Sequence, residues 1–206
     1  MNWSPLNVLL QILAGFLFVA GSAAWLVARR GHHEGQTRAL GLGVAALVAV
    51  YFLAVFTVSL RSREVVLSRG ETKHFCGFYL DCHLSVTVDS VYREPQPAGE
   101  RYHVGLRFAS DARREPLTLH RPGITLIGAD GRTFQPQASV NPATISQQIV
   151  PGGSYQLDVA FDVPAGTTNP RLLVTELEGV WPDKAFELFL IGNEKSVLHK
   201  KVLLAL

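Results

Sequence analysis

Apolar and polar residues follow two different patterns along the chain, and the change falls near residue 60. Two long stretches before that point, residues 5–28 and 39–60, carry no charged side chain. Each reaches the roughly 20 apolar residues that an α-helix needs to cross a bilayer core of about 30 Å. We therefore expect two transmembrane helices, which together form a helical hairpin over residues 1–60.

The first apolar stretch differs from a cleaved secretory signal. A signal peptide begins with a positively charged region and has an apolar segment of only about 7–15 residues. Here the apolar segment is longer, and the residues that open the chain, MNWSPLN, include neither Lys nor Arg. We expect the segment to be retained as a membrane helix.

The connection between the two helices predicts their orientation. It reads RRGHHEGQTR and contains Arg29, Arg30 and Arg38 against the single acidic residue Glu34. Short loops rich in Lys and Arg stay in the cytoplasm. The N-terminus and everything after residue 60 are therefore expected on the other side of the membrane.

Beyond residue 73 the apolar residues alternate with polar ones, which is the pattern of half-buried β-strands. The segments LSVTVDSVY, YHVGLRFAS and SYQLDVAFDV show it best, and turn sequences such as ADGR, VPGG and PAGTTNP separate the strands. Many short strands without a helical period predict an all-β antiparallel, immunoglobulin-like sandwich. We place it at residues 74–206, after a linker at 61–73.

The strand segments also resemble a known family. The succession LSVTVDSV, YHVGLRFAS, LIGADGRTFQP, VPGGSYQLDVAFDVPAG and PRLLV, over about residues 84–176, is similar to the telokin-like, immunoglobulin-like extracellular domain of bacterial lipoproteins and membrane-anchored proteins of unknown function. The resemblance implies a sandwich fold and a location outside the cytoplasm. Its motifs hold no catalytic residue, so the resemblance implies an interaction role only weakly.

The segment KHFCGFYLDCHLSV contains both cysteines of the chain, Cys76 and Cys82. The predicted topology places them in an oxidising compartment, where two cysteines are most simply explained by one disulfide bond. Such a bond would close a short loop before the first long strand and would stabilise the fold by roughly 2–3 kcal/mol. The segment predicts a structural disulfide.

A metal site is the alternative for the same segment, because His74, Cys76, Cys82 and His83 could supply two imidazoles and two thiolates to zinc or copper. Their spacing is not diagnostic. In a strand, the adjacent residues Cys82 and His83 would point to opposite faces. A thiol pair that is reduced or exchanged with a partner is a further alternative.

The sequence contains no nucleophile motif of a serine hydrolase, no glycine-rich phosphate-binding loop and no motif of a zinc-dependent hydrolase. The net charge of +2 is too small and too dispersed to indicate nucleic-acid binding. We expect a multi-pass protein of the bacterial plasma (inner) membrane, with its N-terminus and C-terminal domain extracytoplasmic. We expect it to act as a non-catalytic module without a cofactor, whose partners are the lipid bilayer and an envelope protein or small ligand. A metal-binding or thiol-redox accessory protein of the envelope is the alternative.

Overall fold

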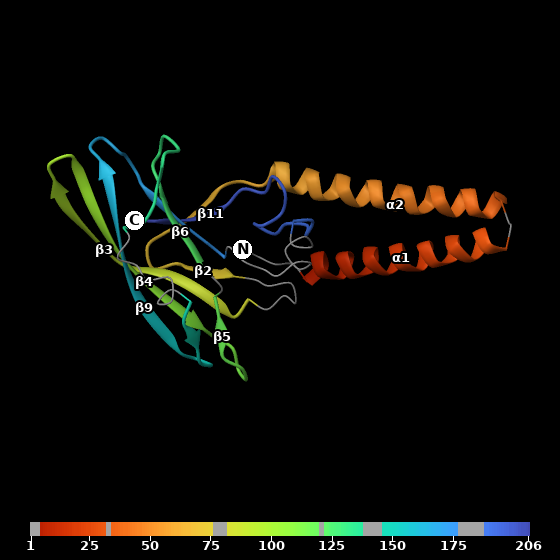
Figure 1. The fold of residues 1–206 in the computed structure, drawn as a ribbon, viewed down its shortest axis with the longest axis horizontal. Coiled ribbons are helices and arrows are strands. Elements are labelled where there is room, and N and C mark those ends of the chain that lie inside the picture. The colour runs from red at the N-terminus through yellow and green to blue at the C-terminus, as the bar shows by residue number, and fades with distance from the viewer. Residues whose placement is uncertain (1–4, 32–33, 76–81, 120–121, 138–145, 177–187) are drawn as a thin grey trace. The chain divides into compact units, whose positions relative to one another are not determined.

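The computed structural model describes residues 5–31, 34–75, 82–119, 122–137, 146–176 and 188–206 (Figure 1). The chain divides into two compact units. One, the helical unit, contains Met1–Arg63 and Ala185–Lys200. The other, the sandwich unit, contains Glu64–Lys184 and Lys201–Leu206.

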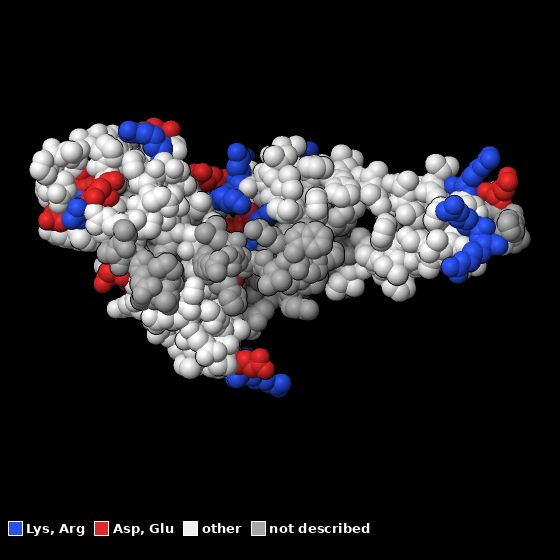
Figure 2. Space-filling model, viewed as in Figure 1, with Lys and Arg blue, Asp and Glu red and all other residues white. Residues whose placement is uncertain are grey.

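The helical unit contains two antiparallel helices, α1 (Pro5–Arg30) and α2 (Glu34–Arg61). Both are long and apolar enough to be candidate membrane spans. Gly41 lets the helices approach closely, because a Cβ atom there would lie 3.2 Å from Nε1 of Trp25 on α1. Arg29, Arg30 and Glu34 lie at the end where the helices are joined, where Figure 2 shows a group of charged side chains, and Arg61 ends α2 at the other end.

A segment far from the helices in sequence also belongs to the helical unit. The hydroxyl of Tyr51 on α2 donates a hydrogen bond to the carbonyl of Phe189 over 2.8 Å. The ring of Phe52 meets the Phe189 ring edge to face, with centroids 5.4 Å apart. Residues 188–200 were expected within the sandwich, but they belong to the helical unit, in which Phe189 contacts α2.

Two main sheets face each other in the sandwich unit (Figure 1). In the described part of the chain, one sheet has the strand order β1-β11-β10-β6-β7 and the other has the order β2-β3-β4-β9. β5 and β8 form a separate two-stranded sheet. The strands are β1 (Val65–Leu67), β2 (Thr72–Phe75), β3 (Leu84–Gln96), β4 (Gly99–Ser110), β5 (Leu117–Thr118), β6 (Pro122–Ile127), β7 (Thr133–Phe134), β8 (Gln148–Ile149), β9 (Ser154–Pro164), β10 (Arg171–Glu176) and β11 (Val202–Ala205).

The core lies between these two sheets, and the predicted alternation supplies it. From Tyr102 onward in β4 and from Leu157 onward in β9, every second residue is buried, whereas the residues between them are at least partly exposed. The opposite sheet contributes aliphatic side chains from β6, β10 and β11 to the same cluster. The inward residues are Tyr102, Val104, Leu106 and Phe108 of β4, Leu157, Val159, Phe161 and Val163 of β9, and Ile124, Leu126, Leu172, Val174 and Leu204 of the facing sheet.

Two details differ from the sequence-based expectation. Residues 61–73, expected to be a linker, include β1 and the first two residues of β2. β1 pairs with β11 in parallel, with Val65 opposite Val202, so the sandwich is not wholly antiparallel. A parallel pair needs a long connection, and almost the whole domain separates these two strands in the sequence.

A β-bulge interrupts the longest strand pair. Val88 lies opposite Leu106, but Ser90 lies opposite Gly105, so that Asp89 is an additional residue in β3. An additional residue exchanges the two faces of the strand from that point on. Val91, rather than Ser90, therefore packs against the core.

Lys73 of β2 is a charged residue inside the sandwich, with only 3% of its surface exposed. Its ammonium group donates hydrogen bonds to the carbonyls of Val174 on β10, at 2.8 Å, and of Val202 on β11, at 3.2 Å. Hydrogen bonds from a charged donor are stronger than neutral ones. One side chain thus connects the two sheets across the core.

The burial of Phe161 gives a first prediction, because its side chain is completely buried between the sheets. Phe161→Ala should lower the free energy of unfolding by about 3–5 kcal/mol, since it leaves a cavity in the core. Urea denaturation of the purified protein measures the effect.

Gln156→Ala on the outward face of the same strand is the matched control. It should change the free energy of unfolding by less than about 0.5 kcal/mol. Equal losses from the two substitutions would contradict the facing of β9.

Candidate functional site

The cysteine-containing segment connects β2 to β3. These strands form an antiparallel pair in which Phe75 lies opposite Leu84. Cys76 follows Phe75 directly and lies outside the described residues, while Cys82 is half-buried two positions before Leu84. The predicted disulfide between Cys76 and Cys82 therefore stays a prediction.

The two histidines proposed as alternative metal ligands engage other groups. Nδ1 of His74 lies 3.3 Å from the backbone carbonyl oxygen of Cys82. Nδ1 of His83 lies 2.6 Å from a carboxylate oxygen of Asp111, which belongs to the loop after β4. Within the described ranges, His, Cys, Asp and Glu side chains form no group of three that could hold a metal ion.

The outward face of β3, β4 and β9 has paired charges. Arg107 donates to Asp89 at 3.0 Å, and Arg101 donates to Asp162 at 2.7 Å. Hydrogen bonds from Arg101 and then from Gln137 hold the pKa of the Asp162 carboxyl below its usual value. Because these pairs are exposed, we interpret them as a solvated sheet surface and not as a catalytic site.

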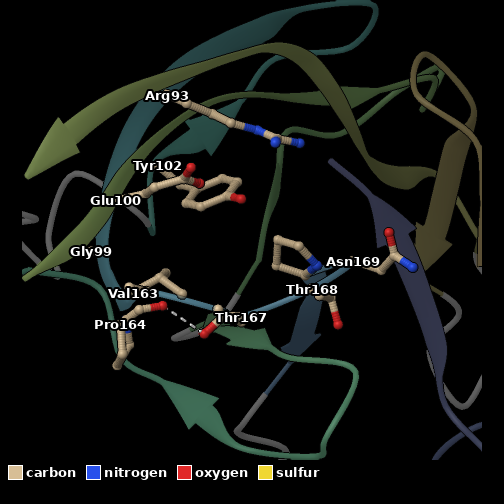
Figure 3. Close-up of a pocket in the computed structure, with 12 residues that line it drawn as sticks. Arg93, Gly99, Glu100, Tyr102, Val163, Pro164, Thr167, Thr168 and Asn169 are labelled. Carbon is tan, nitrogen blue, oxygen red and sulfur yellow. Dashed lines mark hydrogen bonds between the residues drawn. The ribbon is translucent and has the colours of Figure 1, made fainter.

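A cavity of about 420 Å³ opens at the end of the sandwich where β3 turns into β4 and where β9 leads to β10 (Figure 3). Residues of β3, β4 and β9 form one wall, and the connection from Pro164 to Pro170 forms the other. The lining residues are Arg93, Gly99, Glu100, Tyr102, Val163, Pro164, Ala165, Gly166, Thr167, Thr168, Asn169 and Pro170.

The strand register explains why these residues meet. Arg93 lies opposite Tyr102, Tyr102 lies opposite Phe161, and Glu100 lies opposite Val163. Residues directly opposite in an antiparallel pair project to the same face of the sheet. Since Tyr102 and Val163 face the core, Arg93 and Glu100 are on the inward face as well, just where the core gives way to the cavity.

The 164–170 connection has a defined shape. The hydroxyl of Thr167 donates to the carbonyl of Pro164 at 2.9 Å (Figure 3), and the amide of Ala165 donates to the carbonyl of Ala98 at 3.3 Å. Gly166 has a φ of 83°, a conformation that glycine adopts without steric cost. These bonds hold the connection against the turn between β3 and β4.

Gly99 is required at the mouth of the cavity. A Cβ atom at this position would lie 2.0 Å from the carbonyl oxygen of Val163, which no side chain can tolerate. The absence of a side chain therefore lets β4 begin in contact with the end of β9.

Arg93, Glu100 and Tyr102 contribute polar groups to the wall of the cavity that the strands form. The guanidinium carbon of Arg93 lies 5.0 Å from the centre of the Tyr102 ring, and the side chain of Arg93 extends across the cavity (Figure 3). This distance is in the range of a cation–π interaction. The pKa of the Tyr102 hydroxyl is raised mainly by burial and, to a smaller extent, by a hydrogen bond with the neighbouring Glu100 carboxylate.

The sequence analysis did not identify this site. Tyr102 was placed correctly on the inward face of its strand, but as an ordinary core residue. Arg93 was missed because a strict alternation from Val88 assigns it to the outward face, and only the bulge at Asp89 reverses that assignment.

Comparison with known proteins gives a likeness of fold alone. No protein family and no curated protein matches the chain in sequence. Among solved structures, the yjhA protein from Bacillus subtilis aligns over 68% of this chain and 98% of its own, with 13% identity and a TM-score of 0.44. The secreted protein MPT63 from Mycobacterium tuberculosis aligns over 70% of this chain and 98% of its own, with 11% identity and a TM-score of 0.45.

An uncharacterised β-sandwich protein from Clostridium difficile aligns over 71% of this chain and 96% of its own, with 9% identity and a TM-score of 0.41. At such scores these similarities support no argument about the site. The assignment as a β-sandwich follows from the two facing sheets themselves, and membership of the telokin-like family remains a prediction.

Proposed function

We propose that this chain is a membrane-anchored protein of the bacterial envelope whose extracytoplasmic sandwich binds a small ligand without catalysing a reaction. The cavity is the observation that carries the proposal. Its volume of about 420 Å³ is within the range of small-molecule sites. Its lining combines apolar surface from Val163 and Pro170 with the charged groups of Arg93 and Glu100, the mixture that ligand sites use for affinity and orientation.

The exposed surface of the helical unit supports anchoring in a bilayer. Large apolar side chains on both helices are more than 60% exposed, among them Phe16 and Val27 on α1 and Leu42 and Leu53 on α2. A continuous apolar surface of this kind requires a cover, and the lipid bilayer is the cover that fits the lengths of the helices. Arg29, Arg30 and Arg38 favour a cytoplasmic connection between α1 and α2.

The proposal includes a structural disulfide between Cys76 and Cys82. The pairing of Phe75 with Leu84 supports it, because each cysteine follows or precedes this pair by no more than two residues. A bond there would close the connection between β2 and β3. In the proposed compartment such a bond would be stable.

Labelling of introduced cysteines tests the topology. A cysteine in place of Gly35, in the first turn of α2, should resist a membrane-impermeant thiol reagent in intact cells, because the connection is proposed to be cytoplasmic. A cysteine in place of the exposed Glu115 should react, because the sandwich is proposed to be outside. The unmodified chain supplies the background, and the opposite labelling pattern would exclude this topology.

The disulfide is tested by counting thiols in the unfolded protein with and without reductant. We expect no free thiol without reductant and two free thiols after reduction, since the chain has only two cysteines. Replacement of both cysteines by serine should lower the midpoint of thermal unfolding, whereas His74→Ala should have a smaller effect. Stoichiometric zinc or copper that is lost with His74→Ala would favour the metal alternative.

Ligand binding is tested by titrating a library of anionic, cationic and neutral fragments into the isotope-labelled full chain in detergent micelles. Fragments that bind should shift the backbone amide signals of Gly99, Gly166 and Thr167, which line the cavity. Signals of the outward residues Gln156 and Asp158 are the internal reference. A library in which no fragment shifts the cavity signals would contradict the proposed function.

A further inference from the structure

We infer that the cavity binds a small organic monoanion, a carboxylate attached to an apolar body, and that Arg93 is the residue that recognises the carboxylate. The inference rests on the proposal that the cavity is the ligand site, and it names the chemical class of the ligand.

The pairing of the strand arginines singles out Arg93. Arg101 pairs with Asp162, Arg107 with Asp89, and Arg171 with Glu64. Among the residues that the structure describes, no carboxylate forms a salt bridge with Arg93, whose guanidinium instead stacks on the Tyr102 ring. A guanidinium has five N–H donors in a planar arrangement that matches the two oxygens of a carboxylate. The stacked guanidinium is therefore oriented for a ligand that supplies such a group.

The position of Arg93 strengthens this argument. The paired arginines of β4, Arg101 and Arg107, are on the outward face of the sheet, whereas Arg93 is on the inward face opposite Tyr102. Arg93 is nevertheless an exposed residue, so its guanidinium stays in contact with water at the mouth of the cavity. An anion that enters the cavity can replace that water.

Glu100 limits the charge of the ligand. Its carboxylate is on the inward face of β4, in the wall of the same cavity. Like charges at short distance repel each other, so a ligand with two negative charges would be opposed by Glu100. The carboxylate can instead accept a hydrogen bond from an amide or hydroxyl group of the ligand. One negative charge together with one hydrogen-bond donor fits this wall.

The remaining lining determines the body of the ligand. Tyr102, Val163 and Pro170 are almost completely buried on the side of the cavity next to the core, and Pro164 and Ala165 present exposed apolar atoms in its other wall. An aliphatic group placed there would be removed from water, which is favourable. N-acetyl-leucine combines a carboxylate, an amide donor and an aliphatic side chain, and it is the probe that we choose.

Three probes test the inference on the full chain in detergent micelles by the cavity amide signals defined above. N-acetyl-leucine should give saturable shifts with a dissociation constant on the order of 1 mM, the affinity of a weak small ligand. N-acetyl-leucinamide, which has the same body without the charge, should bind at least about tenfold more weakly, because it cannot form charge-assisted hydrogen bonds with Arg93. Inorganic phosphate, which has no apolar body, should give no saturable shift.

Arg93→Gln should weaken the binding of N-acetyl-leucine at least about tenfold. Arg107→Gln, which removes an arginine of the same sheet on its outward face, should leave the binding unchanged. Retained dispersion of the amide signals shows that each variant is folded. The comparison of N-acetyl-leucine with N-acetyl-leucinamide uses the unmodified chain, so it tests the inference even if a variant does not fold.

The possible failures are distinct. Equal binding of the acid and the amide, or unchanged binding by Arg93→Gln, would overturn the carboxylate assignment while the cavity remained a ligand site. Shifts of the cavity signals that are caused only by cationic or neutral fragments would also overturn the carboxylate assignment and leave the cavity a ligand site. An absence of cavity shifts with every probe and fragment would overturn both this inference and the proposed function.

Discussion

The pairing of β4 with β9 is the constraint on which the sandwich depends. It is continuous from Gly99 opposite Pro164 to Ala109 opposite Ser154, so that two long rows of side chains are aligned on the inward face. A shift of one strand by one residue in this register would turn the apolar row of that strand toward solvent. The same register determines where the core ends, because Glu100 and Val163 form its last inward pair before the cavity.

The bulge in β3 links this constraint to the candidate site. Without the additional residue Asp89, the inward row would continue from Val88 through Ser90 and Tyr92. With it, Val91 and Arg93 take the inward positions, and Tyr92 is 65% exposed on the outward face. One additional residue thus places a guanidinium beside the Tyr102 ring. Bulges occur next to functional sites for this reason, since they redirect side chains without ending the strand.

Polar interactions have different roles on the surface of the sandwich and in its core. On the outward face, the ion pairs of Arg101 and Arg107 are exposed, and pairs of this kind contribute little to stability. In the core, the ammonium group of Lys73 donates hydrogen bonds to carbonyls of β10 and β11, which belong to the facing sheet. A buried donor with partners at defined positions favours one relative placement of the sheets, whereas apolar contacts alone are less selective.

The sequence by itself determined the class of the two helices and of the long strands. Uncharged stretches of more than 20 residues indicate helices with an apolar surface, and strict alternation in SYQLDVAFDV indicates a half-buried strand; the structure has both. These patterns are local, because the period of side-chain direction is a property of the backbone of each element. The hairpin turn at Asp130 and Gly131 was predictable for the same reason, and Gly131 has a φ of 82°.

Only the tertiary structure decided which distant residues meet. The parallel pairing of β1 with β11, the contact of Phe189 with α2 and the burial of Lys73 each join residues more than 100 positions apart. The cavity has the same origin, because its walls are the end of one sheet and a connection that returns to it, and because the bulge assigns Arg93 to the inward face. Periodicity describes how a segment would bury one side, but the partner that covers that side, and the place where the cover ends, depend on the packing of the whole chain.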